Sequence, residues 1–316
     1  MGSLIDLHIH SNLSDGELSP KEIIDRAVNN GVSVIAIADH DTTLAYNDEL
    51  FNYAKENNVK LITAVEISTK YKGIGIHVLG YNFDINNMKL KEKLYAIRNA
   101  RHIYLHDVAA KLKELSYIID VDSLDKIDAV TKAHIALNIV ENIENKELLL
   151  KTFGHIPSKG EFIETIMNEG CPCYVEKEAI SPKEASDLIR EAGGKVVLAH
   201  PVAYKYENDL SDDDILNLVK EMNPDGIEAN YVYLDRNGNK VNESTHWNNF
   251  AKHHNLITTI GSDFHKNDGI HSDIGLINED IKLNENEINS IIDNLLNYVF
   301  PQKLCKNFFY CLLSIL

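Results

Sequence analysis

Short apolar runs recur along the chain, and stretches with helical spacing separate them. Apolar residues fill most of positions 4–9 and 32–38, as expected for strands buried in a parallel sheet. Between these runs, Ser19 and Glu22 form a capping box, Pro20 occupies the first helical position and Gly31 ends the helix. The first forty residues therefore predict a strand, a helix and a second strand, which is one β/α unit.

The same alternation continues in two blocks. In the first block we expect a helix over 43–57, a third strand over 61–65 that ends in Glu66, and a strand over 74–80. In the second block, a capping box at Ser181 opens a helix, and strands follow over 196–199, 226–230 and 256–260, with a helix over 243–254. About seven strands alternating with helices favour an α/β fold, a closed or nearly closed β/α barrel with its site at the carboxyl ends of the strands.

The residues between the two blocks have helical spacing and lack strong strand runs. Helical patterns cover 88–116, 132–144 and 159–168. We interpret this part as a helical insertion that forms a wall beside the site. The predicted organisation is a first part of the barrel over residues 1–84, the insertion over 85–170, a second part of the barrel over 171–300, and an apolar tail of unknown role over 301–316.

The charge and the cysteines narrow the range of partners and compartments. The chain has 31 Lys and Arg against 48 Asp and Glu, a formal charge of −17, which argues against stable binding of long DNA because phosphate binding needs a basic surface. A short nucleotide held by metal ions is still compatible with this charge. The four cysteines match no zinc-ribbon or thioredoxin spacing, and no apolar run is long enough to span a bilayer. We therefore expect a cytoplasmic protein with reduced thiols, and the oligomeric state stays open.

Histidines and carboxylates follow the apolar runs. His8 and His10 share one face of the first strand because side chains alternate, so both imidazoles can reach one metal ion. A His-x-His pair is weak evidence alone, but the later runs end in more groups of the same kind. In a β/α barrel all of these groups would meet at one edge of the strands. They are His40, Glu66, His77, His200, Asp263 and His265.

Six segments from both ends of the chain form a specific set: Asp6-Leu7-His8-Ile9-His10-Ser11, Ser14-Asp15-Gly16, Ala38-Asp39-His40-Asp41-Thr42, Glu66, Ala199-His200-Pro201 and Ser262-Asp263-Phe264-His265. In this set the chain resembles the PHP (polymerase and histidinol phosphatase) family of metal-dependent phosphoesterases. It most resembles the branch that hydrolyses 3′,5′-nucleotide bisphosphates and trims short RNA from the 5′ end. The resemblance implies a distorted seven-stranded β/α barrel, and that branch carries a helical insertion at the corresponding place.

The resemblance also implies two or three divalent metal ions, with Mn²⁺ favoured and Fe²⁺ or Zn²⁺ as alternatives. Asp15 stands where some relatives have histidine, and an oxygen ligand favours a harder ion such as Mn²⁺. Carried over position by position, the implied ligands are His8, His10, Glu66 and Asp263 for the first ion, Glu66, His77 and His200 for the second with Glu66 bridging, and Asp15, His40 and His265 for the third.

Further residues are candidates for catalysis and for substrate binding. His200 or His265 could assist proton transfer to the leaving alkoxide, although both are also implied as ligands. The candidate substrate contacts are Arg101, Lys132, His134 and Lys177. Relatives tend to have arginine where Lys132 stands, and this change keeps a point charge but loses the bidentate fork.

The expected activity is hydrolysis of a phosphomonoester of a small nucleotide by a metal-activated hydroxide. The expected substrate is a 3′,5′-nucleotide bisphosphate, which would give a nucleoside 5′-monophosphate and phosphate. The alternatives are 5′→3′ exoribonuclease action on short RNA oligonucleotides, a histidinol-phosphate-type phosphatase, and a C–N hydrolase on the related amidohydrolase barrel. A catalytically silent metal-binding scaffold is the non-enzyme alternative, but such proteins usually lack ligands that are present here.

Overall fold

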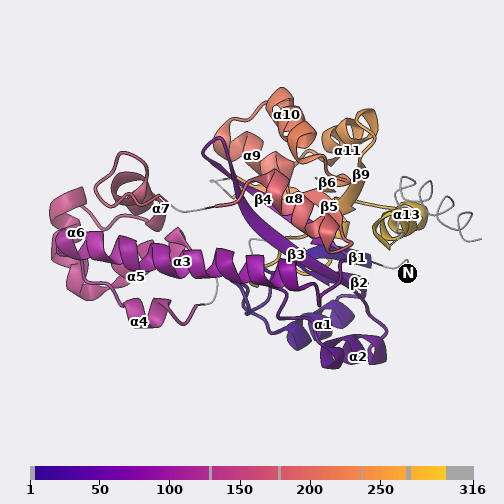
Figure 1. Ribbon diagram of the computed structural model, residues 1–316, viewed down its shortest axis with the longest axis horizontal. Helices are drawn as coiled ribbons and strands as arrows, with labels where there is room; N and C mark the ends of the chain where they lie inside the picture. The colour runs from indigo at the N-terminus through magenta and orange to yellow at the C-terminus, as the bar shows by residue number, and fades with distance from the viewer. Residues whose placement is uncertain (1–3, 128–129, 177–178, 236–237, 268–271, 297–316) are drawn as a thin grey trace, which may run out of the picture.

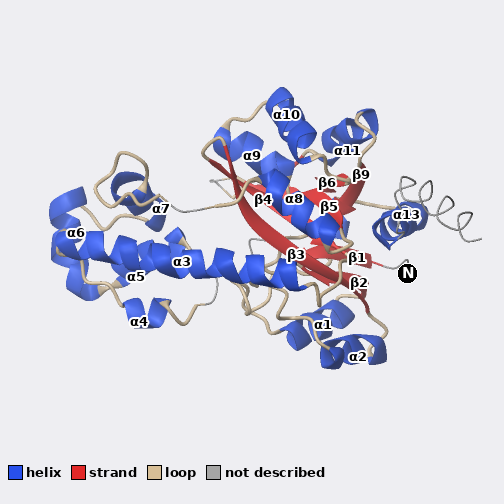
Figure 2. Ribbon diagram, viewed as in Figure 1, coloured by secondary structure: helices blue, strands red, loops and turns tan. Residues whose placement is uncertain are grey.

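The fold is built on one seven-stranded sheet with helices around it (Figure 1). The structure, a computed structural model, describes residues 4–127, 130–176, 179–235, 238–267 and 272–296. The strand order is β1-β2-β3-β4-β5-β6-β9, and Figure 2 shows these strands gathered at the centre of the larger part of the molecule. Their bounds are β1 (Leu4–Ile9), β2 (Val32–Ile37), β3 (Lys60–Tyr71), β4 (Ile74–Tyr81), β5 (Lys195–Leu198), β6 (Gly226–Asn230) and β9 (Ile257–Ile260).

Strand β4 runs against its neighbours, which a simple β/α array does not predict. β1, β2 and β3 pair in parallel, as do β5, β6 and β9, whereas β4 is antiparallel to both β3 and β5. His77 was predicted at the carboxyl end of its strand, but it lies in the amino-terminal half of β4. Because β4 is reversed, this half lies at the same edge as the carboxyl ends of the neighbouring strands, and the amide of Ala199 after β5 donates to the carbonyl of His77.

Strand β3 is longer than its apolar run. The prediction that it ends in Glu66 was wrong, since the strand continues to Tyr71. The polar residues Ser68 and Lys70 stay in the strand because they pair with His77 and Gly75 of β4 in an antiparallel hairpin. Glu66 therefore projects from the middle of a continuous strand, whose backbone holds it on both sides.

The two edges of the sheet approach each other. An isolated parallel bridge joins Ile9, at the end of β1, to Phe264, just after β9. The amide of His10 donates to the carbonyl of Phe264 at 2.8 Å. The curved sheet therefore brings its two edge strands, β1 and β9, close together, which matches the predicted β/α architecture of seven strands.

Helices cover the outside of the sheet, and they begin where the capping signals predict. Ser19 and Ser181 each form a capping box with the glutamate three residues on. A small hairpin of β7 (Val232–Leu234) and β8 (Lys240–Asn242) was not predicted. No described helix has both the length and the apolar character that crossing a membrane requires. The helices around the sheet are α1 (Pro20–Asn29), α2 (Asp48–Glu56), α8 (Pro182–Glu191), α9 (Pro201–Asn208), α10 (Asp212–Met222), α11 (Ser244–His253), α12 (Ile277–Asp280) and α13 (Glu285–Leu296).

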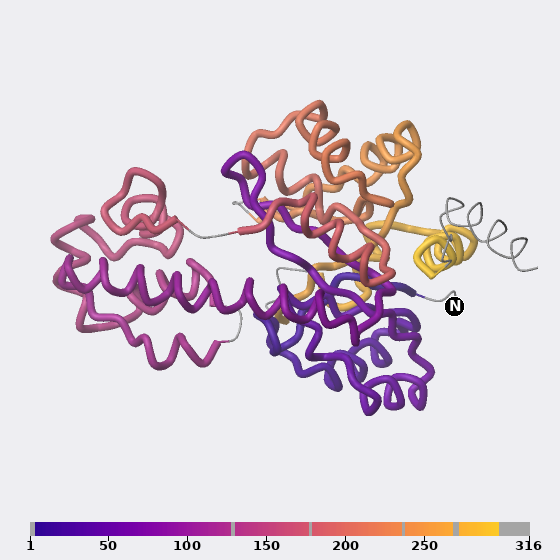
Figure 3. Tube along the Cα trace, viewed as in Figure 1, coloured from indigo at the N-terminus to yellow at the C-terminus, as the bar shows by residue number. Residues whose placement is uncertain are grey.

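The segment between β4 and β5 forms a separate helical body with its own core. The long helix α3 (Met88–Glu114) runs out from the sheet, and the tube in Figure 3 follows the chain along it and into the smaller helices. Leu90 and Leu94, near the start of α3, pack in the core beside the sheet, whereas Val108 and Leu112 pack in the core of the helical body. The other elements of this body are α4 (Val121–Leu124), α5 (Lys132–Glu141), η1 (Ile143–Asn145), α6 (Lys146–Phe153), α7 (Lys159–Phe162) and the π-helix η2 (Ile163–Met167).

Helix α3 thus contributes to the core beside the sheet and to the core of the helical body. The domain boundaries predicted from the sequence stay a prediction, and the apolar tail over 301–316 lies outside the described residues.

Candidate metal centre

Nine side chains named in the sequence analysis lie at one edge of the sheet. His8 projects from β1 and His10 directly follows that strand, while Glu66 projects from β3 and His77 from β4. The others stand on the loops that follow β1, β2, β5 and β9, so the chain brings them in from several strand ends. These loop residues are Asp15, His40, His200, Asp263 and His265.

The first group contains His8, His10, Glu66 and Asp263. The Nε2 atoms of His8 and His10 lie 3.1 Å apart. Oε2 of Glu66 lies 3.4 Å from Nε2 of His8 and 3.3 Å from Nε2 of His10. Oδ1 of Asp263 lies 3.4 Å and 3.1 Å from the same two nitrogens. One ligand atom from each of the four side chains thus surrounds one point, as a bound ion requires.

The two oxygens of Glu66 face different histidines. Oε1 lies 3.1 Å from Nδ1 of His77 and 3.2 Å from Nε2 of His200. Oε2, which faces the first group, also lies 3.1 Å from Nδ1 of His40. This geometry fits a bridging carboxylate between two ions, and it brings His40 closer to Glu66 than the assignment from the resemblance implied.

The third group forms around Asp15. Its Oδ1 lies 3.3 Å from Nε2 of His265 and 3.5 Å from Nδ1 of His10, and its Oδ2 lies 3.7 Å from Nε2 of His40. His10 thus presents one ring nitrogen to this group and the other to the first group. The family resemblance implied Asp15, His40 and His265 for this seat, and the structure places His10 beside them.

The ring nitrogens and carboxylate oxygens in these groups are better placed to bind cations than to form hydrogen bonds with one another. Among the described residues, eight buried side-chain polar atoms have no hydrogen-bond partner, and five of them belong to this cluster. Buried polar atoms normally have a partner, so such a concentration calls for an absent positive group. The five atoms are Nδ1 of His10, Oδ1 of Asp15, Nδ1 of His40, Nδ1 of His77 and Nδ1 of His200.

The pKa shifts of the candidate ligands also favour metal binding. Burial would raise the pKa of Glu66, but electrostatic interactions with His77 and His8 and the hydrogen bond from His10 hold it well below its usual value. Burial lowers the pKa of His40 to about 3, so its imidazole is neutral. Burial opposes protonation of His10, yet hydrogen bonds to Asp263 and Glu66 raise its pKa to about 10. An ionised carboxylate and a neutral imidazole are the states that bind metal, and an ion at His10 would take the place of a proton.

Two buried aspartates hold the loops that carry the ligands. Asp6 accepts hydrogen bonds from the backbone amides of Ser262 and Gly275, at 3.0 and 2.8 Å. Asp39 accepts from the amide and hydroxyl of Ser11, both at 2.6 Å, and from the hydroxyl of Ser14 at 2.7 Å. The loops with Asp15 and Asp263 are thereby fixed against β1 and β2.

Two interactions near the centre were missed by the sequence analysis. Glu228, in the middle of β6, is fully buried and contacts Nδ1 of His8. Asp41, which follows His40, forms a buried ion pair with Arg101 of α3. A charged residue inside the apolar strand 226–230 was the available signal for Glu228. No local pattern could join Asp41 to Arg101, because sixty positions separate them.

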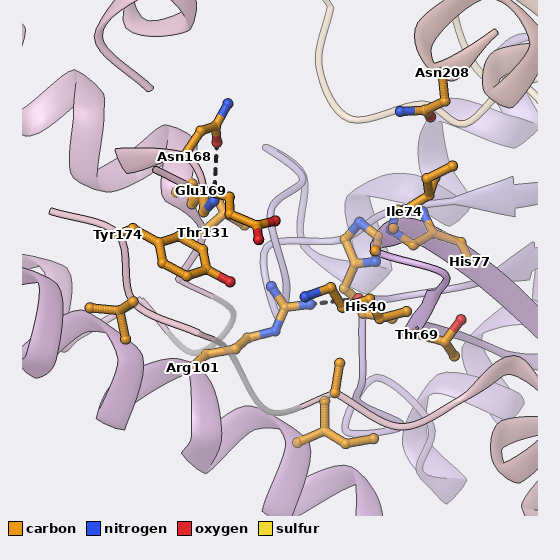
Figure 4. A pocket seen from close by; sticks show the side chains of 18 residues that line it. His40, Thr69, Ile74, His77, Arg101, Thr131, Asn168, Glu169, Tyr174 and Asn208 are labelled. Atoms are coloured by element: carbon orange, nitrogen blue, oxygen red, sulfur yellow. Dashed lines mark hydrogen bonds between the residues drawn. The ribbon is translucent and has the colours of Figure 1, made fainter. Parts of the chain in front are cut away.

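A cavity of about 730 Å³ opens beside the ligands. In Figure 4, His40 and His77 face Arg101, Thr131, Asn168 and Tyr174 across it. One wall therefore comes from the metal edge of the sheet and the other from the helical body.

The four predicted substrate contacts have different surroundings. Arg101 is buried, lines the cavity and donates to Asp41 and to the hydroxyl of Ser68. Lys132 also lines the cavity, where its Nζ donates to Asn168 at 3.2 Å. Nδ1 of His134 accepts from the amide of Thr131, so this ring caps its own helix. Lys177 lies outside the described residues. Contact between any of these four residues and a substrate stays a prediction.

Comparison with known proteins identifies the family. The model of the PHP domain matches residues 6–196, more than half of the chain. The chain belongs to the PHP family. It is 32% identical over 262 residues to a 5′-3′ exoribonuclease of Haemophilus influenzae, with 82% of this chain and 89% of the relative covered. It is 28% identical over 268 residues to a 3′,5′-nucleoside bisphosphate phosphatase of Chromobacterium violaceum, with 83% and 87% covered.

Solved structures agree on the fold of this PHP protein. A crystal structure from Bifidobacterium adolescentis superposes with a TM-score of 0.69 and 21% identity, and covers 94% of this chain and 98% of that one. Together with the family match, the relatives make the protein a metal-dependent phosphoesterase, and its cluster of His, Asp and Glu side chains can bind metal ions.

Addition of Mn²⁺ to metal-free protein is expected to raise its thermal midpoint. An ion that binds only the folded state at a hundred times its dissociation constant adds about 2.7 kcal/mol to the free energy of unfolding. Differential scanning fluorimetry with and without Mn²⁺, on protein stripped with a chelator, measures the shift. An unchanged midpoint over a hundredfold range of Mn²⁺ would contradict a metal centre in the folded protein.

Proposed function

We propose that this PHP protein hydrolyses the 3′-phosphate of a 3′,5′-nucleotide bisphosphate to give a nucleoside 5′-monophosphate and phosphate. The observation that carries the proposal is the cavity, which is lined by the candidate metal ligands His40 and His77 and also by Lys70 and Lys132. One phosphate would lie at His40 and His77 while the second reached the lysines. A volume of about 730 Å³ lies within the range of small-molecule sites, about 300–1,000 Å³.

Two lysines form the candidate site for the second phosphate. Lys70 at the end of β3 and Lys132 at the start of α5 both line the cavity. Burial lowers the pKa of Lys132, and the nearby charge of Lys70 lowers it further. Two ammonium groups that repel each other across a cavity are stabilised by a dianion between them. This pair would favour substrates with a phosphate at each end of the ribose.

The chemistry requires attack by water on phosphorus and cleavage of the bond to the 3′ oxygen. Divalent ions bound by the ligand cluster would lower the pKa of water and neutralise charge on the phosphoryl group. Glu66, with its two oxygens toward different histidines, would hold the two halves of the cluster in register. His200 and His265 stand at the edges of the cluster, and either one could give the leaving 3′ oxygen its proton.

Replacement of Lys132 by methionine is expected to raise KM for adenosine 3′,5′-bisphosphate about tenfold to a hundredfold, because a charged hydrogen bond contributes roughly 1.5–3 kcal/mol. KM for adenosine 3′-monophosphate, which lacks the second phosphate, should stay near the wild-type value. Lys91→Met, at an exposed position on α3, is the matched control. Equal effects of Lys132→Met on both substrates would exclude recognition of the second phosphate by Lys132.

Exonuclease action on short RNA is the second candidate, and the relatives named 5′-3′ exoribonucleases favour it. The chemistry would be the same, with a nucleotide as the leaving group. The formal charge of −17 limits this activity to short substrates, because a long backbone needs a basic surface.

Turnover of the bisphosphate and of a 5′-phosphorylated oligonucleotide, measured with Mn²⁺ on the same preparation, separates the two candidates. We expect release of phosphate from adenosine 3′,5′-bisphosphate with the higher kcat/KM. Faster release of nucleotides from the oligonucleotide would favour the exonuclease. Activity on neither substrate, in protein shown to contain metal, would remove both proposals.

A further inference from the structure

Glu228 is a buried carboxylate next to the candidate metal ligands, and the activity proposed above assigns it no role. It lies in the middle of β6, between β5 and β9, and has no exposed surface. Its Oε1 and Oε2 atoms lie 3.0 and 3.1 Å from Nδ1 of His8. Oε2 also accepts a hydrogen bond of 2.9 Å from the backbone amide of His200. One carboxylate therefore contacts residues from two different groups of candidate ligands.

The contact with His8 determines which ring nitrogen faces the cluster. A carboxylate accepts hydrogen bonds, so Nδ1 of His8 carries the hydrogen in this contact. In a neutral imidazole, Nε2 then holds the lone pair. That lone pair points toward Nε2 of His10, Oε2 of Glu66 and Oδ1 of Asp263, at 3.1–3.4 Å. A ring flipped by half a turn would present carbon instead of nitrogen to this group.

The contact with His200 holds an unusual backbone conformation. His200 has a φ of 24° and a ψ of 62°. These backbone angles lie in a left-handed region that residues other than glycine rarely adopt. The hydrogen bond from its amide to Glu228 compensates for part of this strain. The same backbone conformation turns the imidazole of His200 toward Oε1 of Glu66, 3.2 Å away.

Close packing leaves Glu228 and His8 little freedom to move. Gly261, just after β9, lies against both of them. A Cβ atom at this position would stand 2.2 Å from Cβ of His8 and 2.5 Å from Oε1 of Glu228. Only glycine fits there, so the backbone just after β9 packs directly against both the carboxylate and the imidazole.

We propose that Glu228 is a positioning residue that orients His8 and His200 together, so that one carboxylate sets the geometry of the first and second metal seats. It acts through these two histidines and does not bind an ion itself. Such carboxylate partners of metal-binding histidines typically change metal affinity by about 10–100-fold when they are removed. The inference rests on the metal centre assumed in the proposed function.

Glu228→Gln tests this role with a change of one atom. Glutamine keeps the size of the side chain but has one acceptor oxygen where glutamate has two. The glutamine side chain therefore cannot use separate oxygens to accept from His8 and from His200. Its NH₂ group is a donor and would face at least one of these two N–H donors without forming a hydrogen bond. Calorimetric titration of chelator-stripped protein with Mn²⁺ should show affinity about 10–100-fold weaker than that of the wild type.

Two comparisons separate positioning from a general effect on β6. Asn230→Ala changes a buried polar residue at the end of the same strand, where the side chain bonds Thr259 and Asn248, and it should leave Mn²⁺ affinity near the wild-type value. At saturating Mn²⁺, Glu228→Gln should recover most of the wild-type kcat, because the ions are then in place.

The results distinguish this inference from the metal centre itself. Equal affinity in wild type and Glu228→Gln, or equal loss in Asn230→Ala, would overturn the positioning role alone. A wild-type protein that binds no Mn²⁺ would overturn the metal centre and the inference with it.

A crystal structure of the wild-type protein with Mn²⁺ does not depend on how well a variant folds. It should show Nε2 of His8 at an ion and Nδ1 still on Glu228. An ion on Nδ1 of His8, or directly on Glu228, would also overturn the inference.

Discussion

Glu66→Gln is expected to reduce phosphate release by about a hundredfold to a thousandfold, the scale on which removal of one electrostatic stabiliser acts in an active site. The side chain is 1% exposed, and its two oxygens face five histidines from both sides of the cluster. Glutamine removes the negative charge that two ions would share, so loss of metal and loss of activity should occur together.

The measurement is phosphate release from adenosine 3′,5′-bisphosphate with Mn²⁺, with the far-UV circular dichroism spectrum as a check of folding. Glu221→Gln, at an exposed position in α10, is the matched control and should keep wild-type activity. A folded Glu66→Gln protein with more than a tenth of wild-type activity would show that Glu66 does not bridge the reacting centre.

Arg101→Met is expected to cost about 3–5 kcal/mol of stability, the effect of breaking a buried ion pair by removing one partner. Nε of Arg101 donates to Oδ2 of Asp41 at 3.1 Å, Nη2 contacts the same oxygen, and Nη2 donates to Ser68 at 2.7 Å. Asp41 is fully buried and also accepts from the amide of Ser68. Without Arg101, a buried carboxylate next to His40 has lost its countercharge.

The pH dependence of this loss follows from the pKa of Asp41. Burial would raise that pKa, but the charge of Arg101 and the hydrogen bonds from the amide of Ser68 and from Arg101 outweigh burial and lower it. A carboxyl group whose pKa is lower in the folded state stabilises the fold above its unfolded value of 3.8, and this contribution is lost as the pH falls through the folded value. The difference between wild type and Arg101→Met should therefore be full at pH 7 and narrow below about pH 4.

Urea unfolding at pH 7 and at about pH 3, which is below the unfolded pKa of 3.8, measures both predictions. The double variant Arg101→Met with Asp41→Asn removes the unpaired charge, and it should regain part of the lost stability. A loss below about 1 kcal/mol in Arg101→Met, or no recovery in the double variant, would mean that the pair does not hold the helical body to the metal edge.

The sequence predicted the alternation of strands and helices well, because buried strands and capped helices leave local signals. The capping boxes at Ser19 and Ser181 are present, and the apolar runs correspond to strands of the sheet. The reversed direction of β4 could not be predicted in this way, since an apolar run does not indicate its direction relative to a partner strand. The polar end of β3 was missed for a related reason, because Ser68 and Lys70 stay in the strand only through their pairing with β4.

The candidate site shows the same division between local and distant signals. All nine predicted ligands lie at one edge of the structure, although Glu66 and His77 stand inside their strands and not at the ends that the sequence predicted. Their role as ligands stays a prediction. Glu228 was missed because it lies inside its strand and reaches His8 across the sheet. Arg101 was considered as a phosphate contact, but its partner Asp41 becomes visible only once α3 is placed beside the sheet.

Metal content tests the central claim most directly. Protein stripped with a chelator, loaded with Mn²⁺ and desalted should retain two to three ions per chain when measured by inductively coupled plasma mass spectrometry. Fewer than one ion per chain in the folded wild-type protein would contradict the account, because the nine converging side chains would then not form a metal centre.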